Sequence, residues 1–521
     1  MDYDTLLFWL IAFFSLFGLI GNLVRIRSTG PGWLLVFGSI LALDFAGAWL
    51  NSAALIYAAA ACWFLFGCVP GILSRACFRL VLRQQYGPAR RWALLMSWLH
   101  PLDGWRTQPK LIRTLALSQQ GDLQAAIAGL AKYKEERSTT SITTVIALFR
   151  LTNQWQDMMA WDKERQRELD RLPHLLHARL RARGETQDFQ GLLDLYERNE
   201  AKIARLNPAA LRDLCRLMLY AFSGKRVLVE RLFAGRLAAL PAASQKFWLA
   251  SSDLYAGSHE EARSQLESLR SEADPNLRLA IDHRLSHLAA PTTALDQAAE
   301  VLIQKASLEQ DHEERFGTAP KLLSRHTRAT QLIIVLNLGM FAVEIFQGGS
   351  TNMETLYRLG ALYAPAIRSG EWWRLPASMF LHLGPVHLAM NMIALWVLAP
   401  FVEFALGFRR FLFTYLISGL GSMAVVYALA SRQAAEQLTV GASGSIMGLV
   451  GATGALMLRG WLRHKASVAR RRLIGMITIL LTQSAFDALV PQVSMKAHLS
   501  GAAIGFLLTL LLRDRLQPEG G

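Results

Sequence analysis

Apolar residues gather at the two ends of the chain, and the N-terminal end has the pattern of membrane spans. Residues 5–24 form one apolar run of about 20 residues, enough to cross a hydrocarbon core about 30 Å thick. The stretch 32–73 is again apolar and too long for one helix, so it predicts two spans that meet at a tight turn near Asn51 and Ser52. Three spans are therefore expected in this block.

A cleaved signal peptide is the alternative for the first apolar run. Asp2 and Asp4 stand where a signal peptide carries basic residues, and no A-x-A-like cleavage site follows the run. We therefore favour a retained span.

Six more apolar runs follow in the last part of the chain, separated by short polar stretches. They lie near 329–347, 376–400, 411–430, 443–459, 473–490 and 497–512. Basic residues recur in every second connection: Arg409 and Arg410, then the stretch from Arg459 to Arg472, then Arg513 and Arg515. Short basic loops mark the cytoplasmic side, so the C-terminus is expected inside and the N-terminus outside. The same rule, applied to Arg75, Arg79 and Arg83, makes the middle of the chain cytoplasmic.

Charged residues are concentrated between the two apolar blocks. The chain has 521 residues, of which 52% are hydrophobic and 18% charged, with a formal net charge of +15. Charged residues number 5 in 1–74, 66 in 75–326 and 24 in 327–521. This distribution excludes a purely soluble multidomain protein, and the basic excess follows from topology, so no nucleic-acid partner is expected. The four cysteines show no C-x-x-C pair, so they predict small buried thiols and neither a zinc site nor a disulfide framework.

The middle block, 75–326, is rich in Leu, Ala, Arg and Glu and is expected to be helical. Turn-like openings followed by an apolar helical face start at Gly121, Asn153, Gln187, Ser223 and Gly257. This period of about 34 residues resembles tetratricopeptide repeats over roughly 115–290, although only two copies carry the expected small residue, Ala126 and Ala262. The resemblance implies a concave surface that binds a protein or peptide ligand. A helical array that only orders the membrane parts is the alternative.

Three polar motifs interrupt the last apolar block, where a polar side chain is costly. Ser443 opens the fourth run in GASGSIMG, and His498 opens the sixth in KAHLSGAAIG. His387 and Asn391 lie four residues apart, on one face of the second run. Ser443 is expected to be a nucleophile with His498 as its general base. His387, Asn391 and the Ser443 N–H are expected to stabilise the oxyanion of an acyl-transfer reaction.

Small residues also recur at helical spacing in the fourth and sixth runs: Gly441, Gly444, Gly448, Gly451, Gly501 and Gly505. Such faces let two helices approach closely, so runs four and six are expected to pack together. That packing would bring Ser443 and His498 within hydrogen-bond reach. Gly441, two residues before the serine, is expected to support the oxyanion site.

These segments resemble the rhomboid family of intramembrane serine proteases over about 327–515. The resemblance is carried by G-A-S-G around Ser443, H-x-x-x-N at His387 and Asn391, and A-H-x-x-G-x-x-x-G from Ala497 to Gly505. Residues outside these three motifs also match the family pattern: Trp373 with Arg374, His382, and Glu403 with Gly407. The resemblance implies a Ser–His dyad without an acid, no metal or nucleotide cofactor, and cleavage of single-pass membrane proteins in or near their transmembrane segments. Met447 departs from the family, which often has an aromatic residue four positions after the serine.

Three acidic residues lie inside apolar runs. Asp487 is near the far end of the fifth run and is expected to face a loop or the bundle interior, not to complete a catalytic triad. Asp44 and Glu344 are also expected to face the bundle interior.

Two functions other than proteolysis fit the same pattern less well. A non-proteolytic rhomboid-like adaptor would bind membrane clients and recruit soluble partners through the repeats. Adaptors of this kind usually lack the serine or the histidine, and both are present here. A transporter is disfavoured because no inverted repeat or broken helix pair is visible.

The sequence therefore predicts an all-α fold, a polytopic membrane bundle with a soluble helical-repeat domain. The expected parts are a three-span bundle over 1–74, a cytoplasmic repeat domain over 75–326, a six-span rhomboid-like protease core over 327–515 and a tail over 516–521. The protein is expected to be a multi-pass protein of a bacterial inner membrane.

Overall fold

The computed structural model describes residues 3–23, 31–102, 104–132, 139–287, 296–317, 327–430, 437–490 and 494–516. Nearly all of the tail expected over 516–521 lies outside these residues. Within them, helices are the regular elements, apart from one isolated antiparallel bridge between Leu362 and Thr439. The predicted all-α fold class is confirmed. The chain forms two compact units, Met1–Ser307 and Leu308–Gly521, which join within α20 (Gln297–Phe316).

The chain is a multi-pass membrane protein. Seven described helices are long and apolar enough to cross a membrane: Gly32–Trp49, Ala53–Leu82, Arg328–Phe346, Gly384–Leu406, Phe408–Ala428, Ser443–His464 and Ser467–Leu489. Shorter apolar helical segments of 10–17 residues are Leu7–Leu23, Ser141–Thr152 and Met495–Leu511. The count of nine spans therefore remains a prediction.

The first unit begins with an apolar helical bundle. Its helices are α1 (Tyr3–Leu23), α3 (Gly32–Trp49), α4 (Ala53–Cys62) and α5 (Val69–Leu82). The turn predicted near Asn51 is confirmed, because α3 ends at Trp49 and Asn51 has a φ of 51°. A π-helical turn joins α4 to α5, so the third span continues past its expected end at Leu73. Asp44 is fully buried, as expected.

The cysteines of the first unit differ in burial. Cys77 and Cys215 are buried, whereas Cys62 and Cys68 are only partly buried. The prediction of buried thiols is therefore right for two residues and wrong for the other two.

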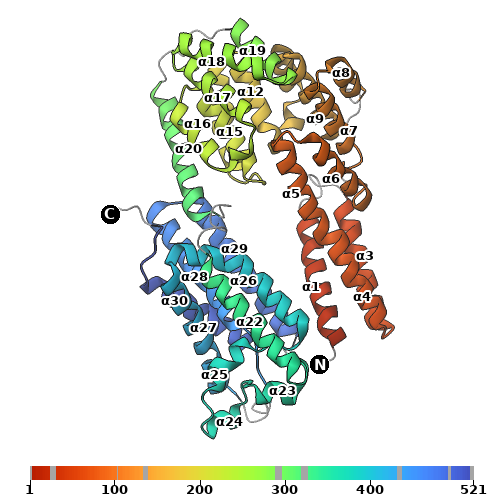
Figure 1. The fold of residues 1–521 in the computed structure, drawn as a ribbon, viewed down its shortest axis with the longest axis vertical. Coiled ribbons are helices and arrows are strands. Elements are labelled where there is room, and N and C mark those ends of the chain that lie inside the picture. Colours follow the sequence, from red (N-terminus) through yellow and green to blue (C-terminus); the bar gives the residue numbers. More distant parts are fainter. Residues whose placement is uncertain are drawn as a thin grey trace. The chain divides into compact units, whose positions relative to one another are not determined.

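An array of helix pairs follows the bundle (Figure 1). Its helices are α6 (Tyr86–Leu99), α7 (Gln108–Gln119), α8 (Leu123–Ala131), α9 (Thr139–Thr152), α10 (Trp155–Glu164), α11 (Gln166–Leu169), α12 (Leu176–Glu185), α13 (Phe189–Arg198), α14 (Glu200–Ile203), α15 (Ala210–Phe222), α16 (Arg226–Ala234), α17 (Ala242–Tyr255), α18 (His259–Glu272), α19 (Pro275–Ser286) and the start of α20. Successive pairs pack on one another, as α8 does on α9 and α15 on α17.

Each opening singled out in the sequence coincides with the turn inside a pair. These turns carry one residue in the left-handed region: Gly121, Asn153, Gln187, Gly224 and Gly257. A left-handed residue ends one helix and lets the chain reverse into the next. Ala126 and Ala262 are fully buried between helices, where a larger side chain would not fit.

The second unit is a helical bundle with short helices at one end (Figure 1). Its helices are α22 (Arg328–Phe346), α23 (Met353–Arg358), α24 (Ala364–Arg368), α25 (Arg374–Ala377), α26 (Gly384–Leu406), α27 (Phe408–Ala428), α28 (Ser443–His464), α29 (Ser467–Leu489) and α30 (Met495–Leu511). The expected start of the second run, at 376, is wrong. Residues 374–380 form α25 and a 3-10 turn, and Gly384, with a φ of 82°, redirects the chain into α26.

Helix α28 is the centre of this bundle. It contacts α26, α27, α29 and α30. In the 18-residue stretch of α28 that could cross the membrane, 78% is buried inside the protein, against 11% in the corresponding stretch of α29. The element that carries Ser443 is therefore held on every side by protein.

Candidate active site

Three helices of the second unit begin at the same place, and their first turns carry the polar motifs. α26 brings His387 and Asn391, α28 begins at Ser443, and α30 brings His498. The backbone N–H groups of a first helical turn have no acceptor within their own helix. The three N-termini therefore supply partial positive charge next to these side chains, and in α30 Ser494 Oγ caps Ala497 N at 3.2 Å.

Gly441 brings the nucleophile candidate and one histidine to a common surface. A Cβ atom built on Gly441 would lie 3.7 Å from Ser443 Oγ, 2.9 Å from His387 Cε1 and 3.0 Å from His387 Nε2. Gly441 has a φ of 130°, which side-chain-bearing residues rarely adopt. Its N–H donates to Ser378 O at 2.9 Å, which fixes the strand-like approach to α28. A residue without a side chain is thus required here for two reasons.

The tautomer of His387 follows from its hydrogen bond. Leu383 N donates to His387 Nδ1 at 3.3 Å, so Nδ1 is an acceptor. In a neutral imidazole the proton then resides on Nε2. Nε2 is the atom that faces Gly441, which makes it a donor aimed at the space beside Ser443 Oγ.

Asn391 offers a second donor. It lies one turn after His387 on α26 and is 6% exposed. Its Nδ2 finds no hydrogen-bond partner among the residues that the structure describes. A buried amide without a partner is costly, and a ligand oxygen would relieve that cost.

His498 is held by an acid that sequence reasoning had set aside. Asp487 Oδ2 lies 2.8 Å from His498 Nδ1, and the Asp487 side chain is fully buried. Gln483 Nε2 donates to the other carboxylate oxygen at 2.8 Å. A carboxylate only accepts, so Nδ1 of His498 carries a proton and Nε2 is left as an acceptor. Asp487 therefore faces the bundle, but it also contacts the histidine, which the sequence did not predict.

Helices α28 and α30 approach within backbone contact. A Cβ atom on Gly501 would collide with Gly444 O, and one on Gly505 would collide with Gly448 O. On the other side of α28, Gly444 and Gly448 face Ser422 Oγ and Ser418 Oγ of α27. Gly444, Gly448, Gly501 and Gly505, four of the glycines expected to pack, thus all lie at close interhelical contacts.

Ser443 and His498 occupy adjoining first turns. A Cβ atom on Gly444 would lie 3.7 Å from Ala497 O, the residue before the histidine. Within the described residues Ser443 Oγ forms no hydrogen bond, so the side chain is free to turn toward a partner. Catalytic hydrogen bonds are often long in ligand-free structures and shorten when substrate binds.

Two buried polar groups brace the loop before α26. His382 N donates to Glu344 Oε1 at 2.9 Å, and both residues are fully buried. Arg374 donates to the carbonyls of Tyr357, at 2.6 Å, and Ala361, at 3.2 Å. These contacts tie the loop of 350–383 to the bundle and so hold the start of α26.

Two further features bear on the chemistry of the site. Met447 is buried against Val450 and Ala502 at the α28–α30 contact, where its thioether adapts to the space available. Among the described residues, no group of three or more His, Cys, Asp or Glu side chains could hold a metal ion.

The comparisons with known proteins fall on this part of the chain. Residues 369–515 match the rhomboid domain model. The chain is 30% identical over 203 residues to rhomboid protease AarA of Providencia stuartii, covering 35% of this chain and 71% of that protein. The chain belongs to the rhomboid family. It is also 34% identical over 203 residues to rhomboid protease GluP of Bacillus subtilis, covering 39% of this chain and 38% of GluP.

A plant relative extends the similarity beyond bacteria. RHOMBOID-like protein 5 of Arabidopsis thaliana is 35% identical over 170 residues, which cover 33% of this rhomboid and 53% of the plant protein. This rhomboid therefore spans only 38% and 53% of the lengths of GluP and RHOMBOID-like protein 5. The rhomboid domain match, residues 369–515, lies within the second unit, and the helix pairs of the first unit are interpreted from their own structure.

Proposed function

We propose that this rhomboid is an intramembrane serine endopeptidase, which cleaves single-pass membrane proteins in or near their transmembrane segments. The observation that carries the proposal is the surface around Gly441, where Ser443 Oγ and the His387 Nε2 donor lie within 4 Å of the same point. A carbonyl group seated there would have a nucleophile on its carbon and a donor on its oxygen, as acyl transfer requires.

In this mechanism His498 takes the proton of Ser443 and later gives it to the leaving amine. Ser443 Oγ attacks the carbonyl carbon, and the hydroxyl proton passes to His498 Nε2. The tetrahedral intermediate then collapses, the C–N bond breaks, and the protonated His498 donates to the departing nitrogen. A water molecule, deprotonated by His498, hydrolyses the resulting acyl-enzyme and regenerates Ser443.

The oxyanion of each intermediate would accept from His387 Nε2, Asn391 Nδ2 and the Ser443 N–H. The first donor is oriented by Leu383 N, and the second is unpartnered in the fold. Donors that are already in position need no reorganisation when charge develops on the oxygen.

Asp487 acts in this proposal as a positioning residue. It accepts from Nδ1 of His498, and this leaves Nε2 as the acceptor for the Ser443 proton. It also stabilises the imidazolium that forms during the attack. The site would then work as a Ser–His pair oriented by a buried acid, beyond the acid-free dyad that the family resemblance implies.

The experiment that tests the proposal uses the full chain in liposomes with a transmembrane model substrate. Cleavage and labelling by a serine-directed fluorophosphonate are expected for the native chain and lost in Ser443→Ala and His498→Ala. Ser500→Ala is the matched control, because Ser500 lies on the same turn of α30 and bonds only the backbone of Lys496 and Ala497. Equal cleavage by native chain and Ser443→Ala would overturn the proposal. Binding of the substrate without cleavage or labelling would instead favour a rhomboid-like adaptor.

The same proposal includes the topology and the domain plan. Arg410 donates to Arg513 O at 2.8 Å, and Arg459 donates to Leu512 O at 3.1 Å, so three basic connections gather at one end of the second unit. That end would be cytoplasmic in a bacterial inner membrane, together with a repeat domain over 75–326. The recurring helix pairs support tetratricopeptide-like repeats that bind a protein or peptide. Labelling by an impermeant thiol reagent of a cysteine placed at exposed Arg113, from the outside of intact cells, would contradict this topology.

A further inference from the structure

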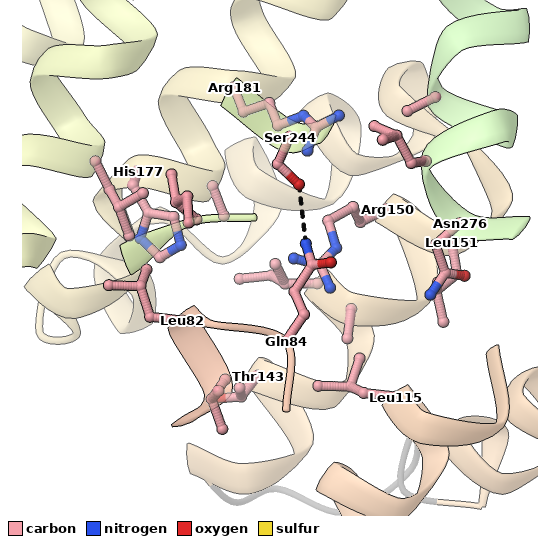
Figure 2. A pocket seen from close by; sticks show the side chains of 18 of the residues that line it. Leu82, Gln84, Leu115, Thr143, Arg150, Leu151, His177, Arg181, Ser244 and Asn276 are labelled. Carbon is pink, nitrogen blue, oxygen red and sulfur yellow. Dashed lines mark hydrogen bonds between the residues drawn. The ribbon is translucent and has the colours of Figure 1, made fainter. Parts of the chain in front are cut away.

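The helix pairs of the first unit enclose a cavity that the proteolytic site does not use. Its volume is about 580 Å³, which lies in the range of small-ligand and peptide pockets. The wall includes residues of α5, the last helix of the apolar bundle, and of α7, α9, α12, α15, α17 and α19 in the array. Figure 2 shows its lining side chains.

Most of the wall is apolar. Leu115, Ile146, Leu151, Leu217, Phe247 and Trp248 are among the lining residues. Large apolar side chains of a ligand would be removed from water here, which favours binding by about 25 cal/mol for each Å² buried.

Two arginines give the cavity its charge. Arg150 of α9 is exposed toward the cavity and makes no ion pair or hydrogen bond within the described part of the chain. Arg181 of α12 lies between Trp155 and Trp248, at 5.0 and 5.1 Å from the two ring centroids, and bonds Glu185 at 3.1 Å. In Figure 2 both side chains lie around the hydrogen bond that joins Gln84 to Ser244. Arg181 is thus held in place, while Arg150 is available to a ligand.

At the wall the arginines outnumber the acidic groups, although Arg181 pairs with Glu185, which does not line the cavity. Asp274 is the single Asp or Glu among the described lining residues. Its Oδ1 atom is already occupied, because it caps α19 by accepting from Asn276 N at 2.9 Å and Leu277 N at 3.0 Å. Burial, the largest cause, lowers the pKa of Arg181, the Glu185 carboxylate raises it, and the charges of Arg150 and Arg284 lower it again. A cavity with this surplus of positive charge attracts an anion.

Amide side chains favour a peptide over a fatty acid or lipid. Gln108 and Gln119 line the cavity, and their side chains make no hydrogen bond to described residues. A peptide backbone offers a donor and an acceptor at nearly every residue, which matches free amides. An acyl chain offers neither.

We propose that this cavity binds an acidic peptide segment with large apolar side chains, and that Arg150 pairs with one of its carboxylates. The proposal rests on the repeats having a peptide ligand and is independent of proteolysis at Ser443. It identifies the ligand by charge and hydrophobicity, two properties that the wall itself displays.

The experiment measures fluorescence anisotropy with the full-length Ser443→Ala chain in nanodiscs, so that no probe is cleaved. The probes are two labelled octapeptide pools, in which Leu or Phe alternates with Asp or Glu in the first pool and with Lys or Arg in the second. The acidic pool is expected to bind at least about tenfold more tightly than the basic pool. Arg150→Gln is expected to weaken the acidic pool about tenfold, and Arg150→Glu to reverse the preference.

Arg113→Gln is the matched control, because Arg113 is exposed on α7 and does not line the cavity. Binding of the acidic pool that is unchanged in Arg150→Gln, or weakened equally in Arg113→Gln, would overturn the proposal. So would an absence of acidic-pool binding, or a labelled fatty acid that binds the same site while the peptides do not. Proteolysis by the native chain is measured separately, so a failure here leaves the proposed protease untouched and the reverse also holds.

Discussion

Asp487 Oδ2 accepts a hydrogen bond from His498 Nδ1 at 2.8 Å, and the two residues come from helices joined by a short loop. Asp487 is on the last turn of α29 and His498 on the first turn of α30. The bond selects the tautomer in which Nε2 of His498 can accept a proton. Asp487 would therefore act on Ser443 only through His498, by holding its imidazole in the form that can accept the serine proton.

Replacing Asp487 is expected to lower kcat and leave KM nearly unchanged. Asp487→Asn keeps the shape but can donate to Nδ1, which favours the wrong tautomer, so kcat should fall by about 10²–10⁴-fold. Asp487→Glu should recover part of the activity, because a carboxylate can still accept. The measurement is cleavage of a transmembrane substrate in liposomes, with fluorophosphonate labelling of Ser443 as a second readout.

A purely structural role for Asp487 would give a different result. Asn and Glu would then lower the melting temperature in parallel with activity, and labelling of the folded fraction would be normal. Asp514→Asn serves as a control, because it removes a buried acid that pairs with Arg459 at the other end of α30. That variant should reduce stability without reducing kcat of the folded protein.

Gly441→Ala is expected to lower kcat strongly without unfolding the bundle. The added Cβ would lie 2.9–3.0 Å from the His387 ring, so the ring must move away from Ser443 Oγ. The φ of 130° adds strain of about 1–3 kcal/mol. Loss of one oxyanion donor lowers kcat by about 10²–10³-fold, which sets the size expected here.

Gly475→Ala is the matched control for this prediction. Gly475 lies within α29 and a Cβ there meets nothing within 4 Å. Alanine favours a helix over glycine by up to about 1 kcal/mol, so stability and kcat should be unchanged or slightly raised. Normal turnover by Gly441→Ala would show that His387 does not act beside Gly441.

The sequence indicated the candidate residues of the site, but not the contacts between them. Ser443, His498, His387 and Asn391 were visible because polar side chains are costly in an apolar run, which makes each one conspicuous. The glycine faces were visible because helical spacing is a local property. The contacts that the sequence did not predict depend on where the helices end in space.

Asp487 and Glu403 show why contacts between helices are not predicted by local sequence patterns. Asp487 meets His498 only because α29 and α30 end and begin at the same level. Glu403 accepts from Ala329 N at 2.8 Å and Thr330 N at 2.9 Å, so it caps α22 from 73 residues further along the chain. No local pattern encodes either distance. The helix pairs were easier to predict from the sequence, because a turn residue recurs once in each pair.

Arg459→Ala is expected to destabilise the second unit by about 2–3 kcal/mol. The guanidinium donates to the carbonyls of Thr509, Leu510 and Leu512 and pairs with Asp514, so it satisfies the C-terminus of α30. Removing it leaves these acceptors without their donor and loosens the α28–α30 contact. Thermal unfolding of the full chain in micelles measures the effect. Arg463→Ala, at an exposed position on the same helix, should change stability by less than about 0.5 kcal/mol.

The helix pairs of the first unit are expected to lose stability as the pH falls from about 6.5 toward 4. Burial, the largest cause, lowers the pKa of His177 to about 4 from its ordinary value of 6.5, and the charges of Arg150 and Arg181 act in the same direction. Between these values the unfolded chain binds a proton that the folded chain excludes, so acid favours unfolding. The effect fades as the pH rises above 6.5, where His177 becomes neutral in the unfolded chain as well.

Glu185 extends the same trend to lower pH. Burial raises the pKa of its carboxyl, but the nearby charges of Arg284 and Arg181 outweigh burial and leave the pKa below its ordinary value of 4.5. The stability that this carboxylate contributes is present above about pH 4.5 and is lost as the pH falls through its folded pKa. The two groups therefore act in succession and with the same sign.

Hydrogen exchange of the α12 amides in the full chain measures this loss directly. The opening free energy of the native chain should fall by about 2 kcal/mol more than that of His177→Gln between pH 7.5 and 4.5. His174→Gln is the comparison variant, because burial also lowers the pKa of His174, the more exposed of the two histidines at this wall. Its loss of stability on acidification should lie between those of the native chain and His177→Gln. If His177→Gln and the native chain lost stability equally, His177 would have to be protonated in the folded array, and the burial that lowers its pKa would have to be relieved by water in the cavity.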